Sequence, residues 1–363
     1  MSLNDLIKER QVPSPLDGIR KKKKTAADFE LQKEKIKKLL QKEEYGFIPA
    51  PPLHVSAEVV QENKIYLGGK ATKTEYVMHA QTERGECTFP FIAYIPNTDN
   101  PSPAFVHINF GNTIPSACHL PIEEIVDRGF ALITFCYTDV ATDNGDFRKL
   151  CAKTLGESRR KGTAPGKIAM WAWAAMRVMD FVMTLDAVDR DNVAIVGHSR
   201  LGKTALVTGA FDERFSYVIS NNSGCSGAAL SRGKVGESIA AITKNFPFWF
   251  CPNYFKYAHN EDKQPFDQNF LISLSVPRTV IVGSAEEDTW ADPHSELLSL
   301  YSVNEVYALY GKRGVEASES DLNAPTRCKG DSYYHLRRGH HFLGRDDWNA
   351  YMDIILECIA KKA

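Results

Sequence analysis

The chain has 363 residues, of which 43% are hydrophobic and 25% are charged, as is ordinary for a globular protein. Its formal net charge of -1 excludes a global field that would attract nucleic acid or an anionic membrane. No run of about 18 apolar residues is present, so no membrane-spanning segment is expected. A chain of this length can bury a large core without disulfide or metal cross-links.

The N-terminal segment and the cysteines bear on the compartment in which the protein works. The first ten residues lack the apolar core of a secretion signal, so a cytoplasmic location is expected, with a trimmed secreted chain as the alternative. The eight cysteines are scattered and include no Cys-x-x-Cys pair, which argues against a zinc site or a redox motif. We therefore expect buried free thiols, and neither a metal nor a cofactor.

The first hundred residues predict one helix followed by short strands. An apolar stripe through Phe29, Ile36 and Leu40 predicts an amphipathic helix over residues 26–41. Alternating apolar and polar residues then predict strands that enter a sheet antiparallel, over 53–60, 64–67, 72–80 and 89–94.

From residue 104 onward, apolar runs alternate with helical stretches, which indicates βα units and a mostly parallel sheet. Strands are predicted over 104–110, 130–137, 193–196, 217–221, 279–283 and 306–310, and helices over 167–185, 203–210 and 347–360. The polar stretch 138–161 is interpreted as a surface excursion over the site. We expect one α/β domain over residues 1–363, with residues 1 to about 100 as an N-terminal helical and antiparallel-strand extension.

The stretch 191–205 carries the most specific chemical signal. The apolar run 193–196 is followed by Gly197, then Ser199, then Gly202 and a predicted helix. Strand, sharp turn with a serine, and helix are the context of a nucleophile elbow, although the usual Gly-x-Ser-x-Gly pattern would place glycine where this chain has Leu201. The helix N-terminus favours negative charge, so Ser199 is predicted to be a nucleophile.

The wider sequence resembles a known family. Gly-His-Ser-Arg-Leu-Gly-Lys at 197–203 is similar to the Gly-Cys-Ser-Arg-x-Gly-Lys signature of glucuronoyl esterases, which form carbohydrate esterase family 15. The resemblance spans roughly residues 100 to 355, and acetylxylan esterase-like proteins carry similar sequence. It includes the segments 209–215, 223–229, 246–250, 265–268 and 288–293.

The resemblance implies an α/β-hydrolase fold, with a central sheet between helical layers in a three-layer sandwich. It also implies a serine carboxylesterase acting on a small-molecule or oligosaccharide ester, with an alkyl or aryl ester of glucuronic acid as first choice. The alternative is an acetyl (xylan) esterase, and a third reading is a non-catalytic carbohydrate-binding relative.

A catalytic base is expected late in the chain, because this fold orders its triad as serine, acid and histidine. Three histidines lie in the segment 333–343, namely His335, His340 and His341. His341 aligns best with the histidine of the relatives, which lies two residues after a glycine. His340 is the alternative.

The acid is where the chain departs from the resemblance. Many glucuronoyl esterases carry Glu in a Glu-Ser-Gly context, whereas this chain has Asn222 there. An amide cannot balance a charged imidazole, so the carboxylate is expected in the loop after the strand 279–283. Asp288 is the first choice, with Asp292 and Glu287 as alternatives.

The remaining candidates concern the oxyanion and the sugar. The backbone N–H of Arg200 is expected to donate to the oxyanion, and a second donor is expected from the loop at 111–112. The resemblance implies that the Arg200 guanidinium also faces the oxyanion. It further implies sugar contacts by three side chains: hydrogen bonds from Lys203 and Glu237, and stacking by Trp290.

Overall fold

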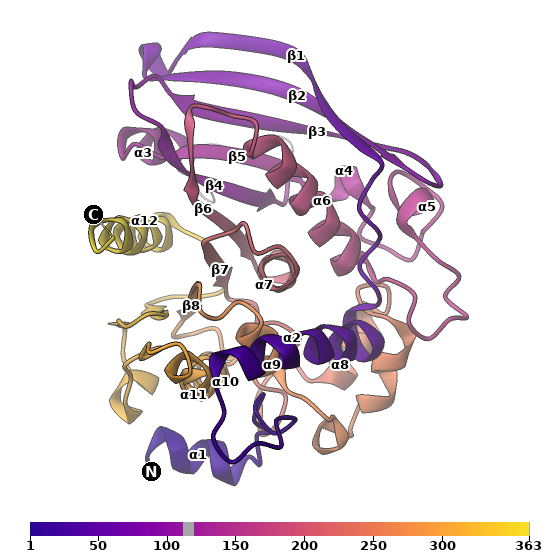
Figure 1. Cartoon of the computed structure of the whole chain (residues 1–363), viewed down its shortest axis with the longest axis vertical. Coiled ribbons are helices and arrows are strands. Elements are labelled where there is room, and N and C mark those ends of the chain that lie inside the picture. The colour runs from indigo at the N-terminus through magenta and orange to yellow at the C-terminus, as the bar shows by residue number, and fades with distance from the viewer. Residues whose placement is uncertain (112–119, 363) are drawn as a thin grey trace.

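The computed structural model describes residues 1–111 and 120–362. Within them, ten strands form one sheet in the order β1-β2-β3-β5-β4-β6-β7-β8-β10-β9 (Figure 1). The strands are β1 (His54–Tyr66), β2 (Ala71–Thr82), β3 (Gly85–Pro96), β4 (Ser102–Asn109), β5 (Ala131–Cys136), β6 (Val188–His198), β7 (Tyr217–Asn221), β8 (Thr279–Ala285), β9 (Thr326–Cys328) and β10 (Tyr333–Arg337).

Strand direction divides the sheet. From β5 through β4, β6, β7 and β8 to β10 every neighbouring pair is parallel. β1, β2 and β3 join antiparallel on one side, where β3 pairs with β5, and the short β9 closes the other side antiparallel. The predicted fold class, an α/β protein with a mostly parallel sheet, is confirmed.

Helices cover the sheet and connect its strands. They are α1 (Leu3–Glu9), α2 (Ala26–Leu40), α3 (Ile122–Asp127), α4 (Tyr137–Val140), α5 (Ala152–Leu155), α6 (Lys167–Val182), α7 (Arg200–Phe211), α8 (Ile239–Asn245), α9 (Gln268–Ser273), α10 (Pro293–Ser302), α11 (Asn304–Ala308) and α12 (Arg345–Ala360). Shorter turns of π or 3-10 type lie at Gln41–Tyr45, Leu67–Gly69, Pro252–Tyr257, Glu261–Lys263 and Glu319–Leu322.

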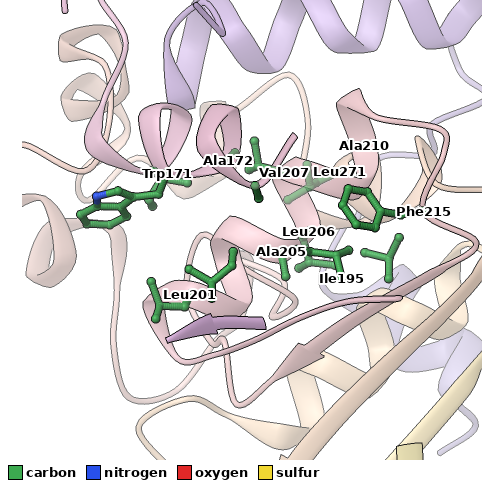
Figure 2. Packing of buried hydrophobic residues seen from close by; sticks show 14 of the residues in the cluster. Trp171, Ala172, Ile195, Leu201, Ala205, Leu206, Val207, Ala210, Phe215 and Leu271 are labelled. Atoms are coloured by element: carbon green, nitrogen blue, oxygen red, sulfur yellow. The ribbon is translucent and has the colours of Figure 1, made fainter. Parts of the chain in front are cut away.

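The central strand β6 is buried on both faces. Val193 and Ile195 belong to a core cluster that also contains residues of α6 and α7, whereas Ala194 and Val196 belong to the cluster on the α12 side. Figure 2 shows Ile195 close to Ala205 and Leu206 of α7. Because successive side chains of a strand point to opposite faces, a strand covered on both sides has a continuous apolar sequence.

The helix predicted over 26–41 has a clear physical start. Thr25 is its N-cap and forms a capping box with Asp28, which satisfies backbone N–H groups that lack helical partners. Phe29, Ile36 and Leu40 are buried along one face, as the sequence pattern indicated. The α-helix ends at Leu40, where a π-helical turn takes over.

Two strand predictions are wrong. The stretches 53–60 and 64–67 are one strand, β1, whose pairing with β2 shifts register between Val59 and Gln61 and again between Asn63 and Tyr66. Residues 306–310, predicted as a strand, form the end of helix α11 and the turn after it. The strand that pairs with β8 on the side away from β7 is β10, which was missed. A short apolar run does not distinguish a buried helical turn from a strand, and only pairing partners decide.

The expectation that all cysteines are free thiols is also wrong. Cys87 in β3 and Cys151, just before α5, form a disulfide with a Cα–Cα distance of 4.8 Å. The other described cysteines are free: Cys136, Cys225, Cys251, Cys328 and Cys358. The two bonded residues are 64 positions apart, so their proximity depends on the tertiary fold.

Two features of the described residues bear on the class of protein. None of the helices there is long and apolar enough to span a membrane. The described His, Cys, Asp and Glu side chains also form no group of three or more that could hold a metal ion.

Candidate active site

Ser199 lies on a strained turn between a strand and a helix. β6 ends at His198, α7 begins at Arg200, and Ser199 between them has φ 57° and ψ -125°. A positive φ is uncommon for a residue with a side chain and concentrates at functional positions. The Ser199 backbone N–H donates to the carbonyl of Asn221 over 2.8 Å, which ties the turn to the end of β7.

The two glycines of the turn are required by close contacts. A Cβ atom at Gly197 would lie 2.1 Å from the carbonyl oxygen of Leu201. At Gly202 it would lie 3.1 Å from the carbonyl oxygen of Asn221, at the end of the neighbouring strand. Leu201 itself is buried in the core (Figure 2). The second glycine therefore lies at 202 because this residue, and not residue 201, faces β7.

The structure brings His341 and Asp288 together beside this turn. Asp288, which follows β8, accepts a hydrogen bond at Oδ2 from His341 Nδ1 over 2.6 Å. The rings of His341 and His198 have centroids 4.5 Å apart, so the imidazole lies against the residue that precedes Ser199. Asp288 is 4% exposed and the His341 side chain is 43% exposed. The candidate base and acid are thus in contact beside the turn that carries the candidate nucleophile, past the ends of β6, β8 and β10.

The surroundings of Asp288 keep its carboxylate charged. Burial alone would raise the pKa of Asp288, but the hydrogen bond and the charge of His341, followed by the hydrogen bond from Asn222, bring its pKa below the ordinary value. Asn222 Nδ2 donates to Asp288 Oδ2 over 2.8 Å, and the backbone N–H of Ala291 donates to Oδ1 over 3.2 Å. The amide at position 222 therefore supports the carboxylate at position 288.

The alternative acids and bases are engaged elsewhere. His340 Nε2 lies 3.2 Å from Glu287 Oε2, and both side chains are more than half exposed. Asp292 is the N-cap of α10 and accepts from the backbone N–H of Ser295 over 3.2 Å. His335 is on strand β10 rather than in a loop, and burial lowers its pKa to about 4.

Arg200 lies at the start of α7 with its guanidinium in an aromatic and acidic setting. Its Nη1 donates to Asp143 Oδ2. Its guanidinium carbon is 4.7 Å from the ring centroid of Trp249, 5.5 Å from that of Phe246 and 5.7 Å from that of Phe110. These distances are within the range of cation–π attraction. The second oxyanion donor was expected from the loop at 111–112, and residue 112 of that loop lies outside the described residues.

The three residues expected to contact a sugar lie near one another. Lys203 is buried, and its Nζ donates to the backbone carbonyls of Ser223 over 2.5 Å and Cys225 over 2.7 Å. Its Nζ also lies 3.8 Å from Glu237 Oε2. The backbone N–H of Glu237 donates to the carbonyl of Trp290 over 3.0 Å, and Trp290 is 56% exposed. Lys203 therefore anchors the loop after β7, a contact that the sequence did not indicate.

A family model described as "Glucuronyl esterase, fungi" matches residues 78–311, more than half of the chain. The chain belongs to the glucuronoyl esterase family. The family membership inferred from the resemblance is thus confirmed, together with the α/β-hydrolase fold that it implied.

Two relatives named as esterases are similar over most of this chain. The carbohydrate esterase MZ0003, from an unknown prokaryotic organism, is 40% identical over 240 residues, which are 64% of this chain and 54% of that protein. This chain thus spans about half of that relative's length. The 4-O-methyl-glucuronoyl methylesterase of Neurospora crassa is 28% identical over 302 residues, 79% of this chain and 69% of that protein.

Solved structures of glucuronoyl esterases match the whole architecture. The glucuronoyl esterase from Solibacter usitatus has a TM-score of 0.84 at 30% identity and covers 95% of this chain and 97% of its own. A promiscuous CE15 esterase from a marine bacterial metagenome has a TM-score of 0.85 at 29% identity, covering 95% and 96% of the two chains.

The sequence of this glucuronoyl esterase did not reveal which side chains contact the Arg200 guanidinium. Asp143 comes from the polar excursion 138–161, and its two oxygens also accept from Trp249 Nε1 and Tyr137 Oη. The excursion was expected to cover the site, but it holds four acids, and nothing in the sequence distinguishes Asp143 from the other three. Trp249 lies in a segment that was matched to the family without a role.

Proposed function

We propose that this protein is a serine esterase that hydrolyses esters of glucuronic acid in small molecules or oligosaccharides. The observation that carries the proposal is the 2.6 Å contact of Asp288 with His341 beside the Ser199 turn. Membership of the glucuronoyl esterase family supports the glucuronoyl ester as the substrate class. The relatives named 4-O-methyl-glucuronoyl methylesterases support a methylated glucuronoyl group as one such substrate.

Acylation begins at the strained turn. Asp288 accepts the Nδ1–H of His341, which leaves Nε2 as the basic nitrogen of the imidazole. His341 takes the proton of Ser199 Oγ as that oxygen attacks the ester carbonyl. The resulting oxyanion faces the backbone N–H and the guanidinium of Arg200 at the helix N-terminus. The C–O bond to the alcohol then breaks, and the alcohol leaves with the proton from His341.

Deacylation repeats the proton transfers with water. His341 takes a proton from a water molecule that attacks the acyl-serine carbonyl, and the bond to Ser199 Oγ breaks. Ser199 regains its proton from His341, and glucuronate is released. In both steps Asp288 stays ionised and stabilises the imidazolium, in keeping with its lowered pKa.

The test compares two substrates and two serine variants. The wild-type protein should hydrolyse benzyl glucuronate faster than it deacetylates acetylated xylo-oligosaccharide, and a serine-directed phosphonate should add one label. Ser199→Ala should abolish both turnover and labelling. Ser216→Ala is the matched control, because its hydroxyl lies at the opposite end of β7 and donates to the carbonyl of Asp191.

Each other outcome selects a different function. Faster deacetylation would support an acetyl esterase in place of a glucuronoyl esterase. Labelling that persists in Ser199→Ala would remove Ser199 from the mechanism. A protein that neither turns over an ester nor takes a label would be a carbohydrate-binding relative.

A further inference from the structure

Asp143 is a nearly buried carboxylate on which three elements converge. It lies between α4 and α5, and its side chain is 15% exposed. Oδ1 accepts from Trp249 Nε1 over 2.7 Å, and Oδ2 accepts from Tyr137 Oη over 2.9 Å and from Arg200 Nη1. The carboxylate of Asp143 is therefore a common acceptor for these three donors.

The same indole that donates to Asp143 also covers the Arg200 guanidinium. The Trp249 ring centroid is 4.7 Å from the guanidinium carbon, and Phe246 stacks on Trp249 with centroids 3.9 Å apart and planes 3° apart. The guanidinium is thus restrained by a carboxylate and by the face of a stacked ring pair. Within the described part of the chain, its buried Nε has no hydrogen-bond partner.

Orientation matters for this particular side chain. An arginine side chain loses rotamer entropy when it is fixed, and a catalytic donor acts fully only when it is fixed before the reaction. The carboxylate of Asp143, bound to one Nη atom of the guanidinium, provides that restraint. Its negative charge also opposes the effect of the guanidinium on an oxyanion, but the Trp249 and Tyr137 donors share the charge of Asp143 and weaken this opposition.

We propose that Asp143 is a positioning residue that holds the Arg200 guanidinium in the orientation in which it stabilises the oxyanion. The proposal rests on the proposed esterase function, because it assigns Asp143 a role in the same chemical step. Asp143 does not touch the substrate and acts through Arg200. Its loss should therefore affect kcat, and only while Arg200 is present.

The experiment is a double-mutant cycle of Asp143→Asn and Arg200→Gln, with kcat and KM measured for each variant. Arg200→Gln should lower kcat by about 10²- to 10³-fold, as for loss of an oxyanion donor. Asp143→Asn in the wild-type background should lower kcat by about 10- to 100-fold with KM within about twofold. In the Arg200→Gln background, Asp143→Asn should change kcat by less than about twofold.

Asp146→Asn is the matched control. Asp146 lies three residues away in the same excursion, and its carboxylate accepts from the Arg148 backbone and guanidinium rather than from the site. Its kcat should equal that of the wild type. If Asp143→Asn fails to fold, Tyr137→Phe removes one donor to Asp143, and its smaller loss of kcat should likewise vanish in the Arg200→Gln background.

The opposite results overturn the proposal. Equal fractional losses of kcat in both backgrounds would make Asp143 a structural residue, and so would a change in KM alone. Every variant is assayed on 4-nitrophenyl acetate and on benzyl glucuronate, since both esters form an oxyanion. A wild-type protein active on the acetate alone would contradict glucuronoyl specificity while the Asp143 test proceeds. A wild-type protein active on neither ester would overturn both proposals.

Discussion

An Asp288→Asn substitution is expected to lower kcat by about 10²- to 10³-fold and to leave the fold intact. Asp288 Oδ2 accepts from both His341 and Asn222, while Oδ1 accepts from the backbone N–H of Ala291. An amide has one acceptor oxygen, so either orientation turns its N–H₂ group toward at least one existing donor. The stability cost of one such lost hydrogen bond is about 1–3 kcal/mol, which a domain of this size tolerates.

The kinetic magnitude follows from the charge that is removed. An ion pair about 4 Å apart near a protein surface is worth about 4 kcal/mol. Because the His341 side chain is 43% exposed, water screens part of this, and about 3 kcal/mol is a better value. Each 1.36 kcal/mol changes a rate about tenfold, so the imidazolium formed during acylation should be disfavoured by about 10²- to 10³-fold.

The assay measures kcat on an acetate ester and a glucuronate ester for Asp288→Asn and for Glu287→Gln. Glu287 is the matched control, since it is the neighbouring exposed acid that pairs with His340. It should retain full activity. An Asp288→Asn variant with undiminished kcat would refute the assignment of Asp288 as the catalytic acid. A large loss of kcat in Glu287→Gln would assign the acid and base roles to Glu287 and His340 instead.

Acid unfolding gives an independent check on Asp288. A carboxyl group whose folded pKa is lowered contributes stability above its unfolded pKa, and this is lost as pH falls through the folded pKa. The difference in unfolding free energy between wild type and Asp288→Asn should therefore be constant near neutral pH and shrink below about pH 4. A difference that grows in acid would contradict the lowered pKa.

Three further predictions concern other parts of the molecule. Lys203→Ala should lower turnover of acetate and glucuronate esters alike, because its ammonium holds two backbone carbonyls of the loop after β7; a higher KM for the glucuronate ester alone would instead indicate sugar recognition. Burial raises the pKa of Glu44 from 4.5 to about 8, so the unfolding free energy of the wild type should fall as pH rises between these two values. In urea titrations Glu44→Gln should remove this pH dependence. The unfolding free energy of the variant should exceed that of the wild type most near pH 8. Replacing Cys87 and Cys151 by serine should lower the unfolding free energy by about 2–4 kcal/mol, since their disulfide joins residues 64 apart. A reducing agent should then destabilise the wild type and leave the double variant unchanged.

Structural features that depend on a few consecutive residues could be predicted from the sequence. The strand, the turn with Ser199 and the helix α7 lie within one short stretch, and each has its own apolar or glycine signature. The strand β7 was predicted with its observed bounds, and the structure pairs it with β6 and β8. Asp288 and His341 were chosen from the fold's order of residues, and the structure places them in contact.

Features that depend on contacts between distant parts of the chain could not be predicted from the sequence. The run 306–310 is wholly apolar, whereas the strand β10 contains His335 and Arg337, so local apolar content favours the wrong segment. Only the pairing of β10 with β8 identifies the strand. The choice between His340 and His341 was likewise open, because adjacent residues share their sequence context. The structure turns one imidazole toward a buried carboxylate and the other toward an exposed one.

The sequence by itself determined the parallel strands β4 to β8, the serine turn and the short set of residues that could act with it. These depend on periodicity and on backbone requirements, such as the glycine at 197, that act over a few residues. Tertiary structure alone decided which carboxylate meets His341, that Asn222 donates to it, that Asp143 meets Arg200, and that Cys87 bonds Cys151. Each of these contacts joins residues more than 50 positions apart, and such distances are closed by packing of the whole core, which no local pattern encodes.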